Sequence, residues 1–150
     1  MQRRAFLSLL SAFVGGASAP KLFAQSFAPE GAPAGADYDF WFTRLAYDSG
    51  NWDVDQRMPA NLVTSLIDYT GLRVDPKEHV LALADPRMLQ APFCYLSGHK
   101  LVEFNADERR NFERYVRNGG FVFVDDCNHD IDGLFARSFE AEMARIFGPS

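Results

Sequence analysis

Side chains that could bind a ligand follow three short apolar segments of this 150-residue chain. Carboxylate, amide and imidazole groups bind cations or sugar hydroxyls, and aromatic rings pack against the apolar faces of ligands. The candidate ligand-binding residues are Arg44, Tyr47, Asn51, Trp52, Asp53, His99, Asp125 and Asp126. The chemistry that they favour is the binding of a sugar or another small molecule.

The acidic turn that begins at Asp125 has two interpretations. Clustered aspartates offer oxygen ligands to a divalent cation, but this turn lacks the glycine and the terminal glutamate of an EF-hand. Asp125 also ends an apolar segment, and Asp132 stands where it would cap the next helix. We therefore predict turns and caps rather than a metal site, and the sequence specifies no cofactor.

The two cysteines are expected to be unpaired. Cys94 begins one apolar segment and Cys127 follows the end of another, so in neighbouring parallel strands they lie at opposite ends of the sheet. About four residues at ~3.3 Å each would separate them, which is beyond disulfide reach. Cys94 should be buried. Cys127 is a poor nucleophile even with His129 or His99 as its base, because the preceding aspartates would raise its pKa.

Alternating apolar strands and amphipathic helices must position these residues. The expected strands are Tyr38–Leu45, Val80–Ala84, Phe93–Ser97 and Phe121–Val124, the last buried on both faces. The expected helices are Asn61–Tyr69, a helix capped by Asn105 with Glu108 and stopped at Asn118-Gly119-Gly120, and Leu134–Phe147. This order predicts a doubly wound, three-layer α/β fold with a mostly parallel, flavodoxin-like sheet of about four strands, ordered 2-1-3-4.

Ligands of open α/β sheets bind beyond the carboxyl ends of the strands, at the switch point of strand order. Three segments should converge there: residues 44–55, 98–100 and 125–132. Arg44 lies among acids and is expected to form an ion pair with Asp125 or Asp126. The fourth strand would be an exposed sheet edge.

The first residues resemble an export signal. Arg3-Arg4-Ala5-Phe6-Leu7 is similar to the twin-arginine motif, and no charge occurs between Ala5 and Ala19. We predict a twin-arginine signal peptide over residues 1–24 with cleavage after Ala24, a linker over 25–37, and one domain over 38–150. The twin-arginine translocase is then the partner during export, and the periplasm is the destination.

The net charge of the chain argues against some classes of binding partner. Removing residues 1–24 takes away Arg3, Arg4 and Lys21 but no acid, so the formal net charge changes from −5 to −8. An acidic surface repels phosphate backbones, so nucleic acid is not expected. No segment after residue 24 is long and apolar enough to span a membrane.

Motifs distributed over the domain resemble an uncharacterised bacterial family, the domain of unknown function 4159. They are Arg44-Leu45-Ala46-Tyr47, Gly50-Asn51-Trp52-Asp53, Tyr95-Leu96-Ser97-Gly98-His99, Asn118 to Asp126, and Arg137-Ser138-Phe139 with Met143 and Phe147. The resemblance implies a fold like that of class I glutamine amidotransferases and trehalose-utilisation proteins. It also implies a chain shorter than other members, which continue with a further strand. The Gly-x-Cys-x-Gly nucleophile elbow of the amidotransferases is absent.

Three functions remain open. The first is a non-catalytic ligand-binding or accessory protein of the cell envelope. The second is a metal-assisted hydrolase or sugar-processing enzyme that uses the same acidic cleft. The third is an interaction module that pairs its exposed sheet edge with another envelope protein.

Overall fold

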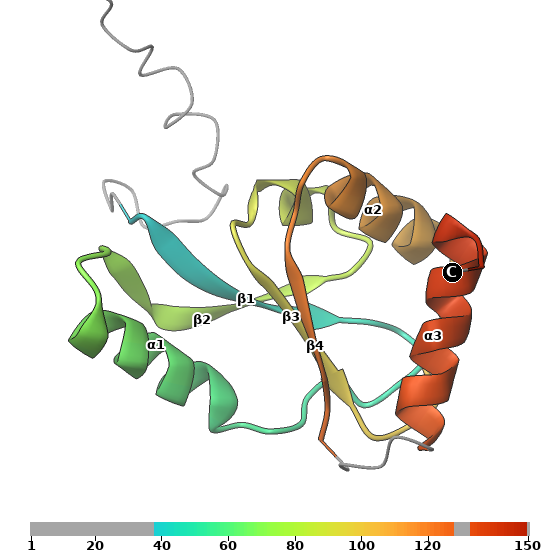
Figure 1. Ribbon diagram of the computed structural model, residues 1–150, viewed down its shortest axis with the longest axis horizontal. Helices are drawn as coiled ribbons and strands as arrows, with labels where there is room; N and C mark the ends of the chain where they lie inside the picture. Colours follow the sequence, from blue (N-terminus) through green and yellow to red (C-terminus); the bar gives the residue numbers. More distant parts are fainter. Residues whose placement is uncertain (1–37, 128–132, 150) are drawn as a thin grey trace, which may run out of the picture.

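The computed structural model describes residues 38–127 and 133–149, which form a four-stranded parallel sheet covered by helices (Figure 1). The strands are β1 (Phe40–Ala46), β2 (Val74–Ala82), β3 (Cys94–Gly98) and β4 (Val122–Asp126). The helices are α1 (Met58–Tyr69), the 3₁₀ helix η1 (Pro86–Gln90), α2 (Ala106–Arg117) and α3 (Leu134–Phe147). The strand order β2-β1-β3-β4 confirms the predicted fold class and topology. The proposed signal and linker lie outside the described residues.

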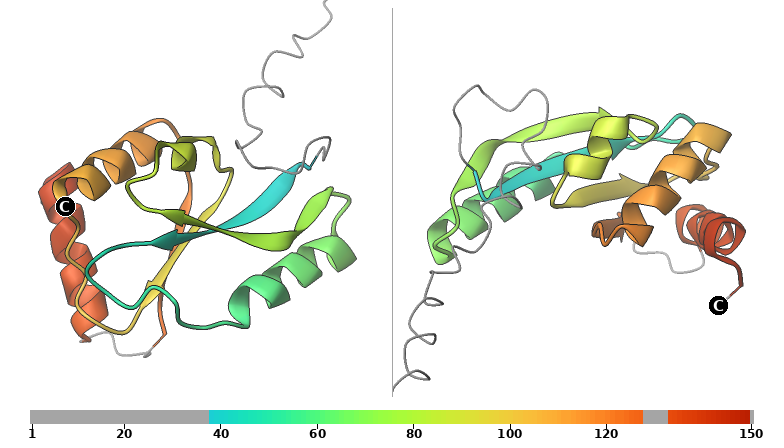
Figure 2. Two further views of the ribbon diagram at one scale, coloured as in Figure 1. Left: turned by 180° about the vertical axis from the view of Figure 1, so that it is seen from behind. Right: turned by 90° about the horizontal axis from the view of Figure 1, so that it is seen from above.

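Each face of the sheet packs against its own helices. Phe42 of β1 and Tyr95 of β3 form one cluster with Val63 of α1. On the opposite face, Leu45 and Leu96 pack with residues of η1, α2 and α3. Successive strand residues point to opposite faces, and both faces of β1 and β3 are buried, as in other parallel sheets. Figure 2 shows α2 and α3 side by side and α1 at the other end of the sheet.

The predicted cap of α2 is present. The Asn105 side chain accepts hydrogen bonds from the backbone N–H groups of Asp107 and Glu108, and the Glu108 carboxylate accepts one from the Asn105 N–H. This reciprocal capping box satisfies donors that a helix terminus leaves open. The helix ends before Gly119, whose positive φ of 87° suits a residue without a side chain.

The predicted start of β2 and the predicted burial of β4 were wrong. β2 begins at Val74 rather than Val80, because a polar run that includes Pro76 pairs at a sheet edge, where strands tolerate proline. β4 is not buried on both faces: Phe121, which precedes it, is 58% exposed and Phe123 is 43% exposed. The predicted edge position of β4 is confirmed, and that position leaves these rings uncovered.

Helix α3 has the predicted bounds, whereas α1 begins three residues early, at Met58. Pro59 lies in the first turn of α1, where its missing N–H breaks no helical hydrogen bond. No helix among the described residues is long and apolar enough to cross a membrane.

Candidate functional site

The loops after β1 and β3 meet above the carboxyl ends of the strands. The Asn51 side-chain oxygen accepts hydrogen bonds from the backbone N–H groups of His99 and Lys100, both at 3.1 Å. The Ser97 hydroxyl lies 3.4 Å from the carbonyl oxygen of Trp52. Asn51 and Trp52 therefore lie beside the end of β3, and His99 is held there through its backbone.

Arg44 organises the loop that carries Asp55. Its side chain is 1% exposed, and its guanidinium donates to the carbonyl oxygens of Val54 at 2.6 Å and Asp55 at 3.5 Å. A buried guanidinium has five N–H donors in a fixed arrangement, so it can hold a loop in place by donating hydrogen bonds to several of its carbonyl groups. The backbone around Asp55 is therefore held in place by the Arg44 side chain of β1.

The ion pair of Arg44 is with Glu78 of β2, so the expected pairing with Asp125 or Asp126 was wrong. Arg44 lies opposite Val80 in the β1–β2 register, and Glu78 precedes Val80 by two residues on the same face. β4 is separated from β1 by β3. The adjacent strand therefore supplies the counter-ion.

Asp55, Asp125 and Cys127 bring three ligand atoms together, all within 4.8 Å of one another. Asp55 has a positive φ of 50°, which is uncommon for residues other than glycine. The Tyr95 hydroxyl donates to Asp125 Oδ2 at 3.0 Å, and the Arg44 guanidinium lies 5.4 Å from the centre of the Tyr95 ring. Arg44 thus contacts the backbone of Asp55 and also the ring of Tyr95, whose hydroxyl binds Asp125.

Cys127 is a poor nucleophile in this environment. Burial raises the pKa of its thiol, and the negative charges of Asp125, Asp55 and Asp126 raise it further. A thiol is nucleophilic as the thiolate, which this environment disfavours. The predicted like-charge effect on the Cys127 pKa is confirmed, although burial contributes more.

A cleft of about 290 Å³ adjoins the cluster. It is lined by Asp55, Met58, Asn61, Leu62 and Ser65. Asp55 belongs to both the cleft and the three-residue cluster. Two carboxylates therefore stand at one end of a cleft whose helical wall carries no charge, an arrangement that can accept a ligand with a cationic group.

Other candidate residues have structural contacts. Tyr47 is 2% exposed, and its hydroxyl donates to the Ser97 carbonyl at 3.0 Å, so its ring is packed in the core. Trp52 packs on the same cluster of core residues. Asp53 is exposed, and its carboxylate accepts a hydrogen bond from the Gln56 side chain.

Asp126 is half-buried, and alternation along β4 places it on the opposite face from Asp125. The remaining members of the acidic turn, including His129 and Asp132, lie outside the described residues. The predicted ligand-binding residues did not include Asp55, Glu78, Tyr95 or Cys127, although Asp55 lies in the segment 44–55 that was expected to reach this rim and Cys127 was considered as a nucleophile. Glu78 and Tyr95 could have been identified only from their positions beside Arg44 in the sheet. These positions are known only once the pairing of the strands is known.

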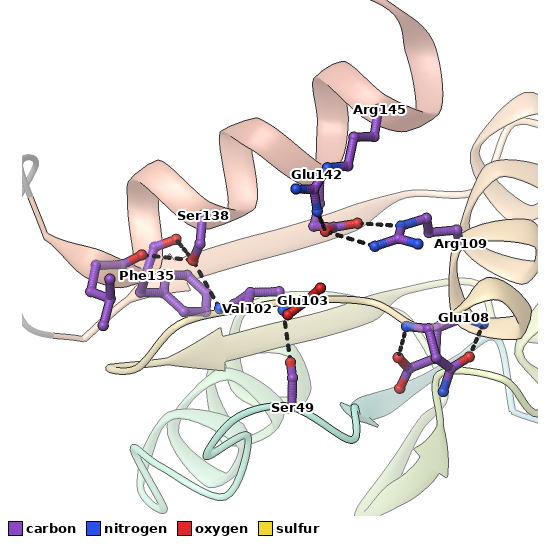
Figure 3. A network of polar contacts seen from close by, with 11 residues as sticks. Ser49, Val102, Glu103, Glu108, Arg109, Phe135, Ser138, Glu142 and Arg145 are labelled. Atoms are coloured by element: carbon purple, nitrogen blue, oxygen red, sulfur yellow. Dashed lines mark hydrogen bonds and ion pairs between the residues drawn. The ribbon is translucent and has the colours of Figure 1, made fainter.

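A separate polar network ties the loops to the helices (Figure 3). The Glu103 N–H donates to the Ser49 hydroxyl at 2.8 Å, and the Val102 N–H donates to the Ser138 hydroxyl at 2.8 Å. The Asp48 N–H donates to the Glu108 carboxylate at 2.9 Å. These contacts join the loop after β1 to α2 and to the loop after β3, and they join the loop after β3 to α3. Asp48 and Glu108 are therefore structural residues.

Residues 41–150 match a family described as a domain of unknown function (DUF4159). The chain belongs to the DUF4159 family. The match begins within β1 and includes every later helix and strand, so the family pattern covers both the sheet and the cluster at its rim. No curated protein sequence matches the chain.

Proposed function

We propose that this DUF4159 protein is an exported envelope protein that binds a small cationic ligand without chemically changing it. Asp55 and Asp125 would hold the cationic group, and the cleft beside α1 would take the rest of the ligand. The observation that carries the proposal is the convergence of these two carboxylates with the Cys127 thiol at the end of that cleft.

Two further features support a binding site. Asp55 adopts a backbone conformation that is unfavourable for most residues, and such conformations concentrate at ligand sites. Arg44 holds that conformation through the Asp55 carbonyl, which pre-organises the carboxylate before a ligand arrives. Export is supported by the paired Arg3-Arg4 ahead of an uncharged segment.

The first test is the effect of cations on thermal stability. Protein recovered from the periplasmic fraction is analysed for bound metal by mass spectrometry, and its melting temperature is measured with Zn²⁺, Mn²⁺, Ca²⁺ and spermidine. A ligand at about one hundred times its Kd stabilises the fold by about 2.7 kcal/mol, which raises the melting temperature by several degrees.

Asp55→Asn and Asp125→Asn should abolish that rise. Asp68→Asn, which removes an exposed carboxylate of α1, should keep it and serves as the control. A rise that survives both cluster substitutions, or no rise with any of the four cations, would refute the binding site.

The second candidate function is metal-assisted hydrolysis. It is favoured by the same three ligand atoms, because two carboxylates and the Cys127 sulfur, which a bound metal would deprotonate, can hold Zn²⁺ and leave a fourth position for water. Turnover of ester, phosphoester or glycoside substrates that disappears in Asp125→Asn would support it. Binding of Zn²⁺ without such turnover would favour the non-catalytic function.

A further inference from the structure

The two edges of the sheet differ in their protection against pairing with another chain. β2 forms one edge, and its register with β1 is interrupted between Val74 and Glu78, where Pro76 and Lys77 are exposed. Proline, lysine and irregular register are features that keep an edge strand from pairing further. β4 forms the other edge, and residues 118–124 contain no charge and no proline. The β4 edge therefore lacks the features that protect the β2 edge.

The main-chain groups of β4 that point away from β3 belong to alternate residues. The Phe121 carbonyl accepts a hydrogen bond from the Cys94 N–H of β3. Because the direction of these groups alternates along a strand, Phe123 also faces β3, whereas Val122 and Val124 face outward. Among the described residues β4 pairs only with β3. Val122 and Val124 can therefore bond a further strand.

Aromatic rings flank this open edge. The Phe121 ring stacks on Phe93 with 5.8 Å between ring centres, and the Phe123 ring stacks on Tyr95 at 6.1 Å. Phe121 and Phe123 are both exposed, and neither belongs to the cluster that packs against α1. Exposed aromatic rings beside an unpaired edge strand indicate a surface that another polypeptide covers.

The β4 edge matches a second copy of itself. Its apolar residues alternate as Phe121-Val122-Phe123-Val124. A two-fold axis through Phe123 would place Val122 opposite Val124 of the other copy in an antiparallel pair. These valines carry the outward-facing groups, so each such pair would exchange two main-chain hydrogen bonds. The Phe123 rings of the two copies would lie side by side on one face of the joined sheet.

Charge favours the antiparallel orientation. Arg117 ends α2 shortly before β4, whereas Asp125 and Asp126 end β4 itself. In the register centred on Phe123, Asp126 of one copy lies opposite Gly120 of the other, three residues after Arg117. Alternation along β4 places Asp126 on the face that α2 covers, which is the Arg117 side of the sheet. A parallel partner in the same register would instead place acids beside acids.

We propose that two copies of this chain pair antiparallel through β4 and join their four-stranded sheets into one. Each copy contributes a five-residue strand and two aromatic rings. This contact is small for a protein interface, so we expect a dimer with a Kd on the order of 10 μM. The dimer surface goes beyond the proposed cation binding, because it uses neither Asp55 nor the cleft beside α1.

Disulfide trapping in the full 150-residue chain tests the register. In a Cys127→Ser background, Phe123→Cys places a thiol at the axis, where facing Cα atoms lie about 4.5 Å apart, within disulfide reach. Phe121→Cys is the matched control, because two residues at position 121 would lie about 14 Å apart. With diamide as oxidant, Phe123→Cys should give about fivefold more linked dimer than Phe121→Cys. Equal yields, or Phe123→Cys chains linked only to other proteins, would overturn the proposal.

Sedimentation equilibrium measures the same contact without a crosslink. The wild-type chain should approach twice the mass of one chain, and Phe123→Lys should weaken the association about tenfold or more, because it brings two like charges to the axis. Leu101→Lys, which replaces a side chain of similar exposure in a loop, should leave the association unchanged. Circular dichroism checks that both variants are folded. A dimer that survives Phe123→Lys would overturn the proposal.

Charge variants test the orientation. Arg117→Glu should weaken the dimer about two- to fivefold, whereas Arg110→Glu should leave it unchanged. Arg110 is a matched control, because it is exposed on the same helix and also has a local carboxylate partner, Asp107. Equal effects of the two substitutions would contradict the antiparallel pairing. A chain that stays monomeric at about 0.5 mM, far above the expected Kd, would refute the dimer itself. No ligand enters these measurements, so they are independent of the cation-binding test.

Discussion

Glu142 of α3 is fully buried and accepts two hydrogen bonds from Arg109 of α2, from Nε at 2.7 Å and from Nη2 at 3.1 Å (Figure 3). Arg145 donates to the same carboxylate from the next turn of α3. A buried carboxylate is tolerated when such partners satisfy it. This ion pair joins the two helices that cover one face of the sheet.

Glu142→Gln should lower the free energy of unfolding by about 1–3 kcal/mol, because the neutral amide cannot satisfy two guanidinium groups. Urea denaturation at pH 7 measures the change. Glu113→Gln, which alters the exposed i,i+4 pair with Arg117, is the control and should have little effect. Equal losses in the two variants would show that Glu142 has no special role.

The Glu142 pair should also make stability depend on pH. Burial alone would raise the pKa of Glu142, but the hydrogen bonds and charges of Arg109 and Arg145 outweigh it and hold the pKa below its ordinary value of 4.5. Its contribution is therefore present above about pH 4.5 and is lost as the pH falls through the lowered folded pKa. The stability difference between wild type and Glu142→Gln should shrink over that acidic range; a constant difference would contradict this assignment.

Gly98→Ala should destabilise the fold by about 1–3 kcal/mol through overpacking. A Cβ atom at Gly98 would lie 2.3 Å from the Tyr47 hydroxyl oxygen and 2.7 Å from the Phe135 ring. Gly71→Ala is the matched control, because a Cβ atom there meets no atom within 4 Å. Urea denaturation of both variants should show a loss only for Gly98→Ala.

The two thiols should differ in reactivity. Burial raises the pKa of Cys94 to about 12, so it should react with a disulfide reagent only after unfolding. Cys127 is half-buried and should react slowly in the folded protein. Thiol titration should count one group in native buffer and two in denaturant, and Cys127→Ser should remove the native one. Persistence of native labelling in Cys127→Ser would contradict the burial of Cys94.

Arg3→Lys with Arg4→Lys should trap precursor in the cytoplasm, because the translocase recognises paired arginines rather than positive charge alone. Immunoblots of periplasmic and cytoplasmic fractions measure the distribution. Continued export of the double variant would refute the twin-arginine assignment.

Local signals were sufficient for much of the fold. The capping box at Asn105, the bounds of α3 and the free thiols follow from short-range chemistry or simple geometry. The exposure of β4 does not, because Phe121-Val122-Phe123-Val124 has the composition of a buried strand. Whether such a strand is covered depends on what packs beside it.

The candidate site was harder to predict for the same reason. The expected convergence of acidic turns around Arg44 suggested acids on β4 as its partners, whereas its counter-ion is Glu78 on the neighbouring strand. Tyr47 suggested a stacking platform, yet its ring is enclosed by the core. Both outcomes depend on which way a side chain points, and strand register determines that direction.

The position of β1 constrains how the protein is made. This strand pairs with both β2 and β3, so among the described strands the one that is synthesised first lies between two later ones. Its partner Cys94 is synthesised some fifty residues after Thr43, and until then one edge of β1 stays open on the nascent chain. Chaperones that hold nascent chains would therefore meet the aromatic segment Phe40-Trp41-Phe42 before the sheet can enclose it.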